Sequence, residues 1–257
     1  MWGTLDSVVR RIFPSGWVDA VRQVLMFAAA YYAYRIVRGA VDAHPAAAFE
    51  NARHLIGIEQ SLHTFFEPSL QAWATSNSWL IDFASWMYVN SHFVITISAL
   101  VFLYFFRNES FYFVRNMFMV AMGLALICYV VYPTAPPRFF PEWGFHDSVS
   151  EFTGIPQDSV IVNALVNPFA AVPSMHVAFS LLVGLPLARL VRPRPLKALW
   201  YAYPVLVTFV VMATGNHFWL DALLGAAVAG LSAYVAKSLL ARARPHAWAF
   251  ARASVEA

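Results

Sequence analysis

Long apolar runs separated by short charged segments dominate the chain. A transmembrane helix needs about 20 predominantly apolar residues, and six runs approach that length. They cover residues 18–38, 83–106, 111–132, 175–191, 197–214 and 218–237. This pattern predicts an all-α integral membrane protein, a bundle of six transmembrane helices.

The six runs differ in how well they suit a full membrane crossing. The first run has a short uncharged centre, because Arg22, Arg35 and Arg38 must extend their charged groups toward the interfaces. The last three runs are short, and each carries a polar side chain at one end. Short helices whose polar ends meet at one depth indicate a wet pocket below the membrane interface.

The segment 45–78 is too polar to cross a membrane, yet some of its apolar residues recur at helical spacing. Those residues are Leu55, Ile58, Leu62, Phe65 and Phe66. We therefore expect this segment to be interfacial and to lie along the membrane surface.

The remaining boundaries follow from the same pattern. We expect a single membrane domain over 1–257, with 18–38 as its first helix, a catalytic five-helix core over 80–237 and a cytoplasmic tail over 238–257. The loop 133–173 is rich in proline and glycine, and a loop of that length in a compact bundle is usually functional or disordered.

Composition supports the membrane assignment and excludes other classes. The chain is 60% hydrophobic and only 12% charged, whereas soluble domains are about 25% charged. A net charge of +3 without a basic, aromatic-rich stripe argues against nucleic acid as a partner. The single cysteine, Cys128, excludes an internal disulfide and a thiol metal site. No cleaved signal peptide is recognisable, so the first membrane helix is expected to direct insertion.

Basic residues are unevenly divided between the two predicted sides. With six spans, the N-terminus, the loops 107–116 and 189–197 and the C-terminus share one side, which holds most of the arginines and lysines. The positive-inside bias makes that side cytoplasmic. The chain is therefore expected to be a multi-pass cell-membrane protein with both termini in the cytoplasm. The loop 133–173 and the turn 214–217 then face outward, so the predicted site is extracytoplasmic.

Two polar residues near the last run suggest chemistry. His217 and Asp221 are four residues apart, a spacing that puts both on one face of a helix. The carboxylate can then fix the tautomer of the imidazole and leave its other nitrogen free to attack. A carboxylate within a membrane segment is costly without a partner or a role, which strengthens this interpretation.

Further residues at predicted helix starts suit an anionic ligand. A helix N-terminus attracts anions, and Ser174 and His176 lie at one such start. Arg138 adds a planar guanidinium that matches phosphate oxygens. Taken singly, Ser174 is an ordinary helix cap, His176 an interfacial anchor and Arg138 part of a rigid turn. Together with His217 and Asp221 they predict a phosphoryl-transfer site that needs no metal and no other cofactor.

These motifs resemble a known family. The segments "PSMH" (173–176) and "HFWLD" (217–221) are similar to the second and third signature motifs of the type 2 phosphatidic acid phosphatase (PAP2) superfamily. The segments "YPTAPPR" (132–138) and "TGNH" (214–217) resemble its inositol phosphorylceramide synthase-like branch, whose members are inositolphosphotransferases. The resemblance covers about residues 80–237.

The resemblance implies six helices, an outward active site and catalysis through a phosphohistidine. His217 would be the nucleophile, Asp221 its orienting carboxylate and His176 the acid that protonates the leaving oxygen. Arg138 and Ser174 would hold the phosphoryl oxygens.

The chain departs from the pattern of the family's phosphatases at three positions. Val131 and Val211 stand where those enzymes have a lysine and an arginine, and Phe139 replaces a proline. These departures favour the synthase-like branch. Additional phosphate contacts are then expected from Asn216, from Tyr132 and from the amides at the helix starts.

Other polar residues are candidates for the substrate pocket. Asn90 and His92 lie within the second run, where an interhelical hydrogen bond is about as plausible as headgroup recognition. Glu59, Glu67 and Gln71 are expected to line a pocket rim and to read a polyol headgroup.

The sequence therefore predicts an enzyme that cleaves a phospholipid or another lipid-linked phosphate. The phosphoryl group passes to water or to an alcohol such as an inositol lipid, ceramide or a sugar, and the sequence does not separate hydrolysis from transfer. A lipid-binding or transport protein with a decayed site is the alternative of another class. The complete set of candidate catalytic residues and the lack of inverted repeats argue against it. Vanadate-dependent peroxidases share the paired histidines by family resemblance, but they are soluble.

Overall fold

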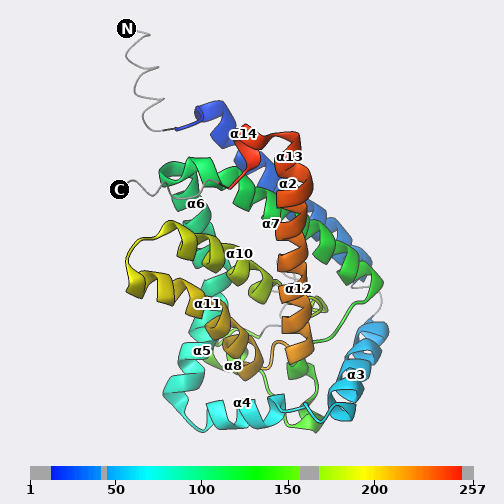
Figure 1. The fold of residues 1–257 in the computed structure, drawn as a ribbon. Coiled ribbons are helices and arrows are strands. Elements are labelled where there is room, and N and C mark those ends of the chain that lie inside the picture. The colour runs from blue at the N-terminus through cyan, green and yellow to red at the C-terminus, as the bar shows by residue number, and fades with distance from the viewer. Residues whose placement is uncertain (1–12, 42–44, 157–167, 251–257) are drawn as a thin grey trace.

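The computed structural model describes residues 13–41, 45–156 and 168–250, and the regular elements within them are helices joined by turns (Figure 1). The α-helices are α2 (Trp17–Val41), α3 (Pro45–Ser61), α4 (Glu67–Thr75), α5 (Ser78–Asn90), α6 (Thr96–Phe106), α7 (Asn108–Val131), α8 (Ser148–Thr153), α10 (Met175–Leu190), α11 (Arg194–Ala213), α12 (Trp219–Val235), α13 (Ala241–Ala243) and α14 (Pro245–Trp248). π-Helical turns η1 (Ser91–Ile95) and η4 (Ala236–Leu240) and 3₁₀ turns η2 (Pro137–Phe139) and η3 (Pro141–Trp143) complete the order.

Several helices have the length and apolar character of a membrane span. Within the described residues they are α7, α11 and the stretch Trp219–Ala243, and α5 with α6 makes a fourth if that bent pair is one span. The chain is thus all-helical with three to four candidate spans, as expected of a multi-pass membrane protein. The further two of the six predicted spans stay predictions.

The departures from the predicted spans have physical causes. The run expected as one helix over 83–106 is bent by 47° at η1. At 1.5 Å per residue, a helix of 16 residues such as α10 is about 24 Å long, whereas the hydrocarbon core is about 30 Å thick. Helix α2 begins with the polar residues Asp19, Arg22 and Gln23, which lower its hydropathy.

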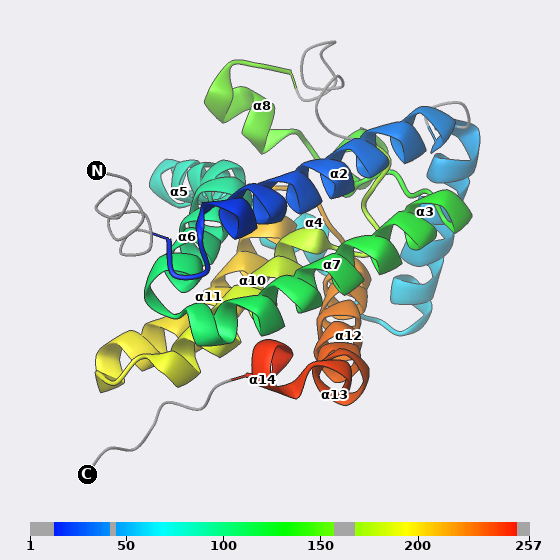
Figure 2. The same cartoon turned by 90° about the horizontal axis from the view of Figure 1, so that it is seen from above.

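The polar residues of α2 have partners on α7. Arg115, which interrupts the apolar run of α7, is buried and donates to Gln23 Oε1 over 2.9 Å. The Tyr112 hydroxyl donates to Asp19 Oδ2 over 2.7 Å. Figure 2 shows α2 lying along α7 on the outside of the bundle. Arg22 is exposed, and the side chains of Arg35 and Arg38 lie outside the described part of the structure, so their extension toward the interfaces stays a prediction.

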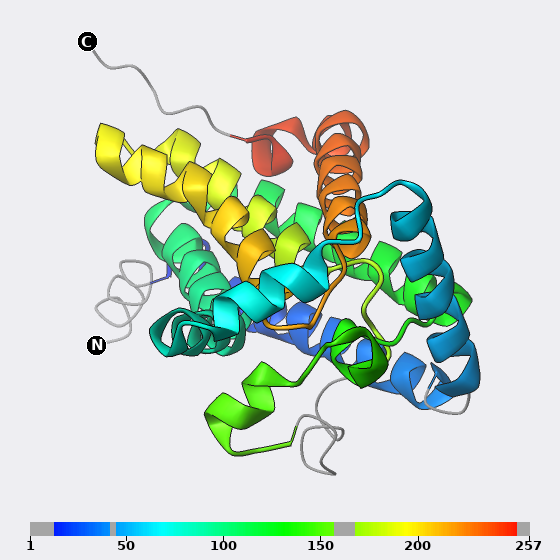
Figure 3. The same cartoon turned by 90° about the horizontal axis from the view of Figure 1, so that it is seen from below.

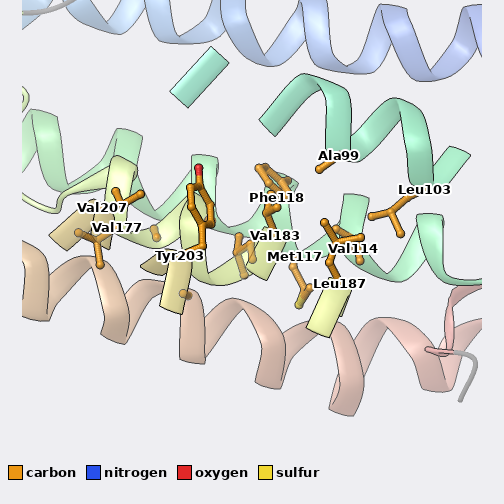
Figure 4. Packing of buried hydrophobic residues seen from close by; sticks show 14 of the residues in the cluster. Ala99, Leu103, Val114, Met117, Phe118, Val177, Val183, Leu187, Tyr203 and Val207 are labelled. Atoms are coloured by element: carbon orange, nitrogen blue, oxygen red, sulfur yellow. The ribbon is translucent and has the colours of Figure 1, made fainter. Parts of the chain in front are cut away.

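The main core lies between α6, α7, α10 and α11 (Figure 4). Phe118, Val183 and Val207 are almost fully buried there. Gly184 allows the close approach of α10 and α11, because a Cβ at this position would lie 2.6 Å from the carbonyl oxygen of Trp200.

Helix α3 packs on the rest of the protein through a face rich in alanine. Its buried residues are Ala48, Ala52, Leu55, Ile56 and Glu59, whereas Ile58, Leu62 and Phe66 are exposed. The helix ends at Ser61 and the chain turns at His63, where φ is +57°. The alanine face packs on the apolar cluster of Phe140, Phe145 and Phe218. The exposed apolar residues remain available to a membrane surface, so the interfacial position of 45–78 stays a prediction.

Candidate active site

The segments that carry the candidate residues are joined by backbone hydrogen bonds. Thr134 N–H donates to the carbonyl of Phe169 over 2.8 Å, and Ala171 N–H donates to that of Thr134 over 3.2 Å, which forms an isolated parallel bridge. Arg138 N–H donates to the Gly215 carbonyl over 2.8 Å. The loop that follows α7 is therefore fixed to both histidine-bearing segments.

The turn before α10 lies directly against α12. Ser174 N–H donates to the Asp221 carbonyl over 3.0 Å. A Cβ at Gly225 would lie 2.3 Å from the Ser174 carbonyl oxygen, so only glycine allows this approach. Ser174 is fully buried, and its Oγ accepts from Val177 N–H over 3.5 Å as the cap of α10. The predicted helix cap is confirmed, and phosphate binding by Ser174 stays a prediction.

His217 and Asp221 form a buried pair. Nδ1 of His217 lies 3.3 Å from Oδ2 of Asp221, and the same oxygen accepts from Phe218 N–H over 2.9 Å. Asp221 is completely buried and His217 is 5% exposed. With Nδ1 directed at the carboxylate, Nε2 is the ring nitrogen whose lone pair can attack.

His176 faces this pair from the first turn of α10. Its ring centroid lies 5.8 Å from that of His217, at an interplanar angle of 61°. On its other side the His176 ring stacks on Tyr88 of α5, with centroids 4.4 Å apart. Sequence reasoning missed Tyr88, because no motif connects α5 to α10.

Arg138 is fixed by neighbours on three sides. Its Nη1 donates to Asn216 Oδ1 over 2.6 Å, and its Nε lies 3.8 Å from Asp147 Oδ2. Its guanidinium lies 4.9 Å from the ring centroid of Phe139, the residue that replaces the family's proline. Asn216 also donates to Thr214, so its amide orients the arginine, and phosphate binding by Asn216 stays a prediction. Sequence reasoning missed Asp147, which lies in the long loop outside any motif.

The hydroxyl of Tyr132 donates to the Asn51 carbonyl of α3 over 3.2 Å, and its expected contact with phosphate stays a prediction. Burial and the negative charge of Asp221 raise the pKa of Tyr132 above its ordinary value. The hydroxyl therefore stays protonated and ties the end of α7 to α3.

The amides at the start of α12 are occupied by side-chain carboxyls. Trp219 N–H donates to Glu67 Oε1 over 2.7 Å, and Leu220 N–H donates to Glu59 Oε1 over 3.3 Å. Phe218 N–H is bound by Asp221. The prediction that both helix starts present amides to a phosphate is therefore wrong for α12.

Glu59, Glu67 and Gln71 lie in the interior rather than at a pocket rim, since all three are 0% exposed. Gln71 Nε2 donates to the His146 carbonyl over 2.9 Å and to Ser148 Oγ over 3.1 Å, which holds the loop beside Arg138. The expected rim position is therefore corrected to an interior one for all three residues.

The two candidates on α5 and η1 have different outcomes. Asn90 Nδ2 donates to the Trp86 carbonyl one turn earlier in α5, over 2.8 Å, so the bond described is within one helix rather than between helices. His92 lies in η1, and its side chain is outside the described part of the structure.

Over the described residues, no group of three or more His, Cys, Asp or Glu side chains could hold a metal ion.

Comparison with known proteins assigns the family. A sequence profile of the PAP2 superfamily matches residues 53–235, which is more than half of the chain, and the chain belongs to this superfamily. No curated protein and no solved structure matches the chain. Membership implies a phosphoesterase-type activity, metal-independent as in the phosphatases and transferases of the superfamily, and it suggests lipid-phosphate substrates.

Proposed function

We propose that this protein is a lipid phosphotransferase of the inositol phosphorylceramide synthase-like branch, acting through a phosphohistidine at His217. The observation that carries the proposal is the buried His217–Asp221 pair facing the ring of His176, with Arg138 held beside them. Because the two imidazole centroids are 5.8 Å apart, both rings can reach one phosphoryl group.

In the first step, the Nε2 lone pair of His217 attacks phosphorus. The bond from phosphorus to the leaving oxygen breaks, and protonated His176 gives its proton to that oxygen. Asp221 accepts the Nδ1–H hydrogen bond and stabilises the positive charge that develops on the imidazole. The products are a phospho-His217 enzyme and the released alcohol.

In the second step, neutral His176 removes a proton from the acceptor hydroxyl, and the acceptor oxygen attacks phosphorus. The phosphorus–nitrogen bond breaks, so His217 and His176 return to their starting states. In both steps Arg138 stabilises the charge on the non-bridging oxygens. Its bond to Asn216 and its approach to Asp147 hold the guanidinium before substrate arrives.

The lack of two basic side chains found in the family's phosphatases favours transfer to an alcohol over hydrolysis. Val131 is 74% exposed at the end of α7, whereas Val211 is fully buried, and its carbonyl accepts from the backbone N–H groups of Asn216 and His217. Neither position supplies the basic side chain of the family's phosphatases, so we assign fewer charge contacts to the phosphate and an alcohol as acceptor. From the distribution of basic residues we also propose an extracytoplasmic site and cytoplasmic termini.

A substrate panel tests the proposal. Purified protein is given lipid phosphates and phosphoinositides, each with and without ceramide, diacylglycerol or a polyol as acceptor. We expect acceptor-dependent formation of a new phosphoester. Release of inorganic phosphate at the same rate without any acceptor would contradict transfer and favour a simple lipid phosphate phosphatase.

A further inference from the structure

Two helices distant in sequence from α12 hold its first turn. Glu67 of α4 binds Trp219 N–H, and Glu59 of α3 binds Leu220 N–H. The Trp219 indole N–H also donates to Thr64 Oγ1, in the turn between α3 and α4, over 3.2 Å. Figure 3 shows α4 crossing the end of the bundle where α12 begins.

Ionisation of both carboxyl groups at once is energetically unfavourable. Both are 0% exposed, and Glu59 Oε2 and Glu67 Oε2 have no donor in the described part of the chain when both groups are carboxylates. The side chains can hydrogen-bond to each other only if one of them carries a proton. Burial, followed by the charge of Glu67, raises the pKa of Glu59 from 4.5 to about 9, and burial also raises the pKa of Glu67.

One shared proton leaves one negative charge on the pair. A single negative charge is favourable at a helix N-terminus, where the backbone N–H groups carry partial positive charge. A second negative charge would add repulsion between Glu59 of α3 and Glu67 of α4. It would also add repulsion between this pair and Asp221 of α12, the other charged group that acts on both carboxyls.

We propose that Glu59 and Glu67 are positioning residues for the phosphoryl-transfer reaction, a proton-sharing pair that fixes the start of α12 and thereby the attack geometry of His217. The inference rests on the proposed role of His217. Trp219 and Leu220 lie between His217 and Asp221 in sequence, so a shift of these two residues changes the 3.3 Å contact that orients the imidazole. The pair acts through this contact and does not touch the phosphate.

Two substitutions at Glu59 separate positioning from general support. Glu59→Gln keeps an acceptor for Leu220 and supplies a permanent N–H donor to Glu67, so it mimics the protonated acid. Glu59→Ala removes both bonds. Glu50→Gln is the matched control, because Glu50 is an exposed carboxyl on the same helix.

The experiment measures kcat, KM and single-turnover phosphoenzyme formation between about pH 6 and pH 10, on detergent-purified protein checked for thermal stability. We expect Glu59→Gln to keep kcat at neutral pH within about threefold of the wild type. We also expect it to shift the alkaline limb of the pH profile of kcat to higher pH. We expect Glu59→Ala to lower kcat and phosphoenzyme formation about tenfold or more with little change in KM, since small misplacements of a reacting group are that costly.

The outcomes distinguish this inference from the proposed function. Wild-type alkaline behaviour in Glu59→Gln, or Glu59→Ala kinetics equal to those of Glu50→Gln, would overturn the positioning role while leaving the phosphohistidine chemistry intact. If Glu59→Ala does not fold, the profile of Glu59→Gln decides. A wild type without phosphoryl turnover would overturn both the proposed function and this inference.

Discussion

Individual residues at the site act mainly by holding one another. Asp221 binds both the His217 ring and the Phe218 amide, so one carboxylate fixes the imidazole and the start of α12 together. Tyr88 supports His176 from behind by stacking. Each imidazole therefore has its own support, and this allows different roles for the two rings.

Substitution of His176 by alanine tests whether the two imidazoles have different roles, with His217 as nucleophile and His176 as proton donor. We expect His176→Ala to lose turnover of alkyl phosphate esters by about 100-fold or more, because their leaving alkoxide needs a proton. An ester with a nitrophenolate leaving group needs no acid, so the variant should still form phosphoenzyme from it. That phosphoenzyme should accumulate, since the second step lacks its base.

Rapid-quench measurement of phosphoenzyme with both kinds of ester checks this expectation. Equal loss with the two substrates would indicate that His176 does not act as the proton donor. Tyr88→Phe serves as a control, because it keeps the stacked ring and removes only the hydroxyl.

Contacts between residues close in sequence could be predicted from the sequence, whereas contacts between distant segments could not. The spacing of His217 and Asp221 was sufficient because the partners are only four residues apart, although His217 precedes α12 instead of lying on a helix with Asp221 as expected. The roles of Glu59 and Asp147 were not predictable, since their partners Leu220 and Arg138 come from other segments of the fold. Glu59, Glu67 and Gln71 were expected at a pocket rim, but their burial depends on packing between helices that no local pattern encodes.

Helices bring the site together by unusually close contacts. The start of α10 approaches α12 at Gly225, and α3 approaches the loop after α7 through Ala48 and Ala52. At the same scale, the bend between α5 and α6 was not predicted: Asn90 and His92 were noted as polar residues in the run, but polar residues alone do not specify a π-helical turn. The lack of a side chain at Gly225 is the feature most open to test.

We expect Gly225→Ala to destabilise the protein and to lower activity. The new Cβ would lie 2.3 Å from a backbone oxygen, so α10 and α12 must separate, and overpacking of this kind typically costs about 1–3 kcal/mol. Gly230→Ala on the same helix is the control, because a Cβ added at Gly230 would have no neighbouring atom within 4 Å. There alanine should be neutral or stabilising by up to about 1 kcal/mol.

Thermal unfolding of both variants in the same detergent measures the difference. A Gly225→Ala protein as stable and as active as Gly230→Ala would contradict the role assigned to this contact.

At the scale of the whole molecule, the question is which side of the membrane the site faces. Helices α3 and α4 lie at the end of the bundle where α12 begins (Figure 1). The proposed orientation puts this end outside the cytoplasm, because most basic residues lie in the segments assigned to the other side.

Cysteine labelling tests the orientation in intact cells. In a Cys128→Ala background, we expect Glu142→Cys to react with a membrane-impermeant maleimide added outside, whereas Arg192→Cys should react only after the membrane is opened. Both side chains are exposed on the protein. The reverse labelling pattern would contradict the proposed topology.

The central claim is that His217 carries the phosphoryl group, and trapping that intermediate tests it most directly. Protein is mixed with a substrate labelled with radioactive phosphorus, quenched rapidly and digested to locate the label. The account predicts an acid-labile, base-stable phosphoryl group on the peptide that contains His217, and no label in His217→Ala. Label that persists in His217→Ala, or full turnover by that variant, would contradict the account.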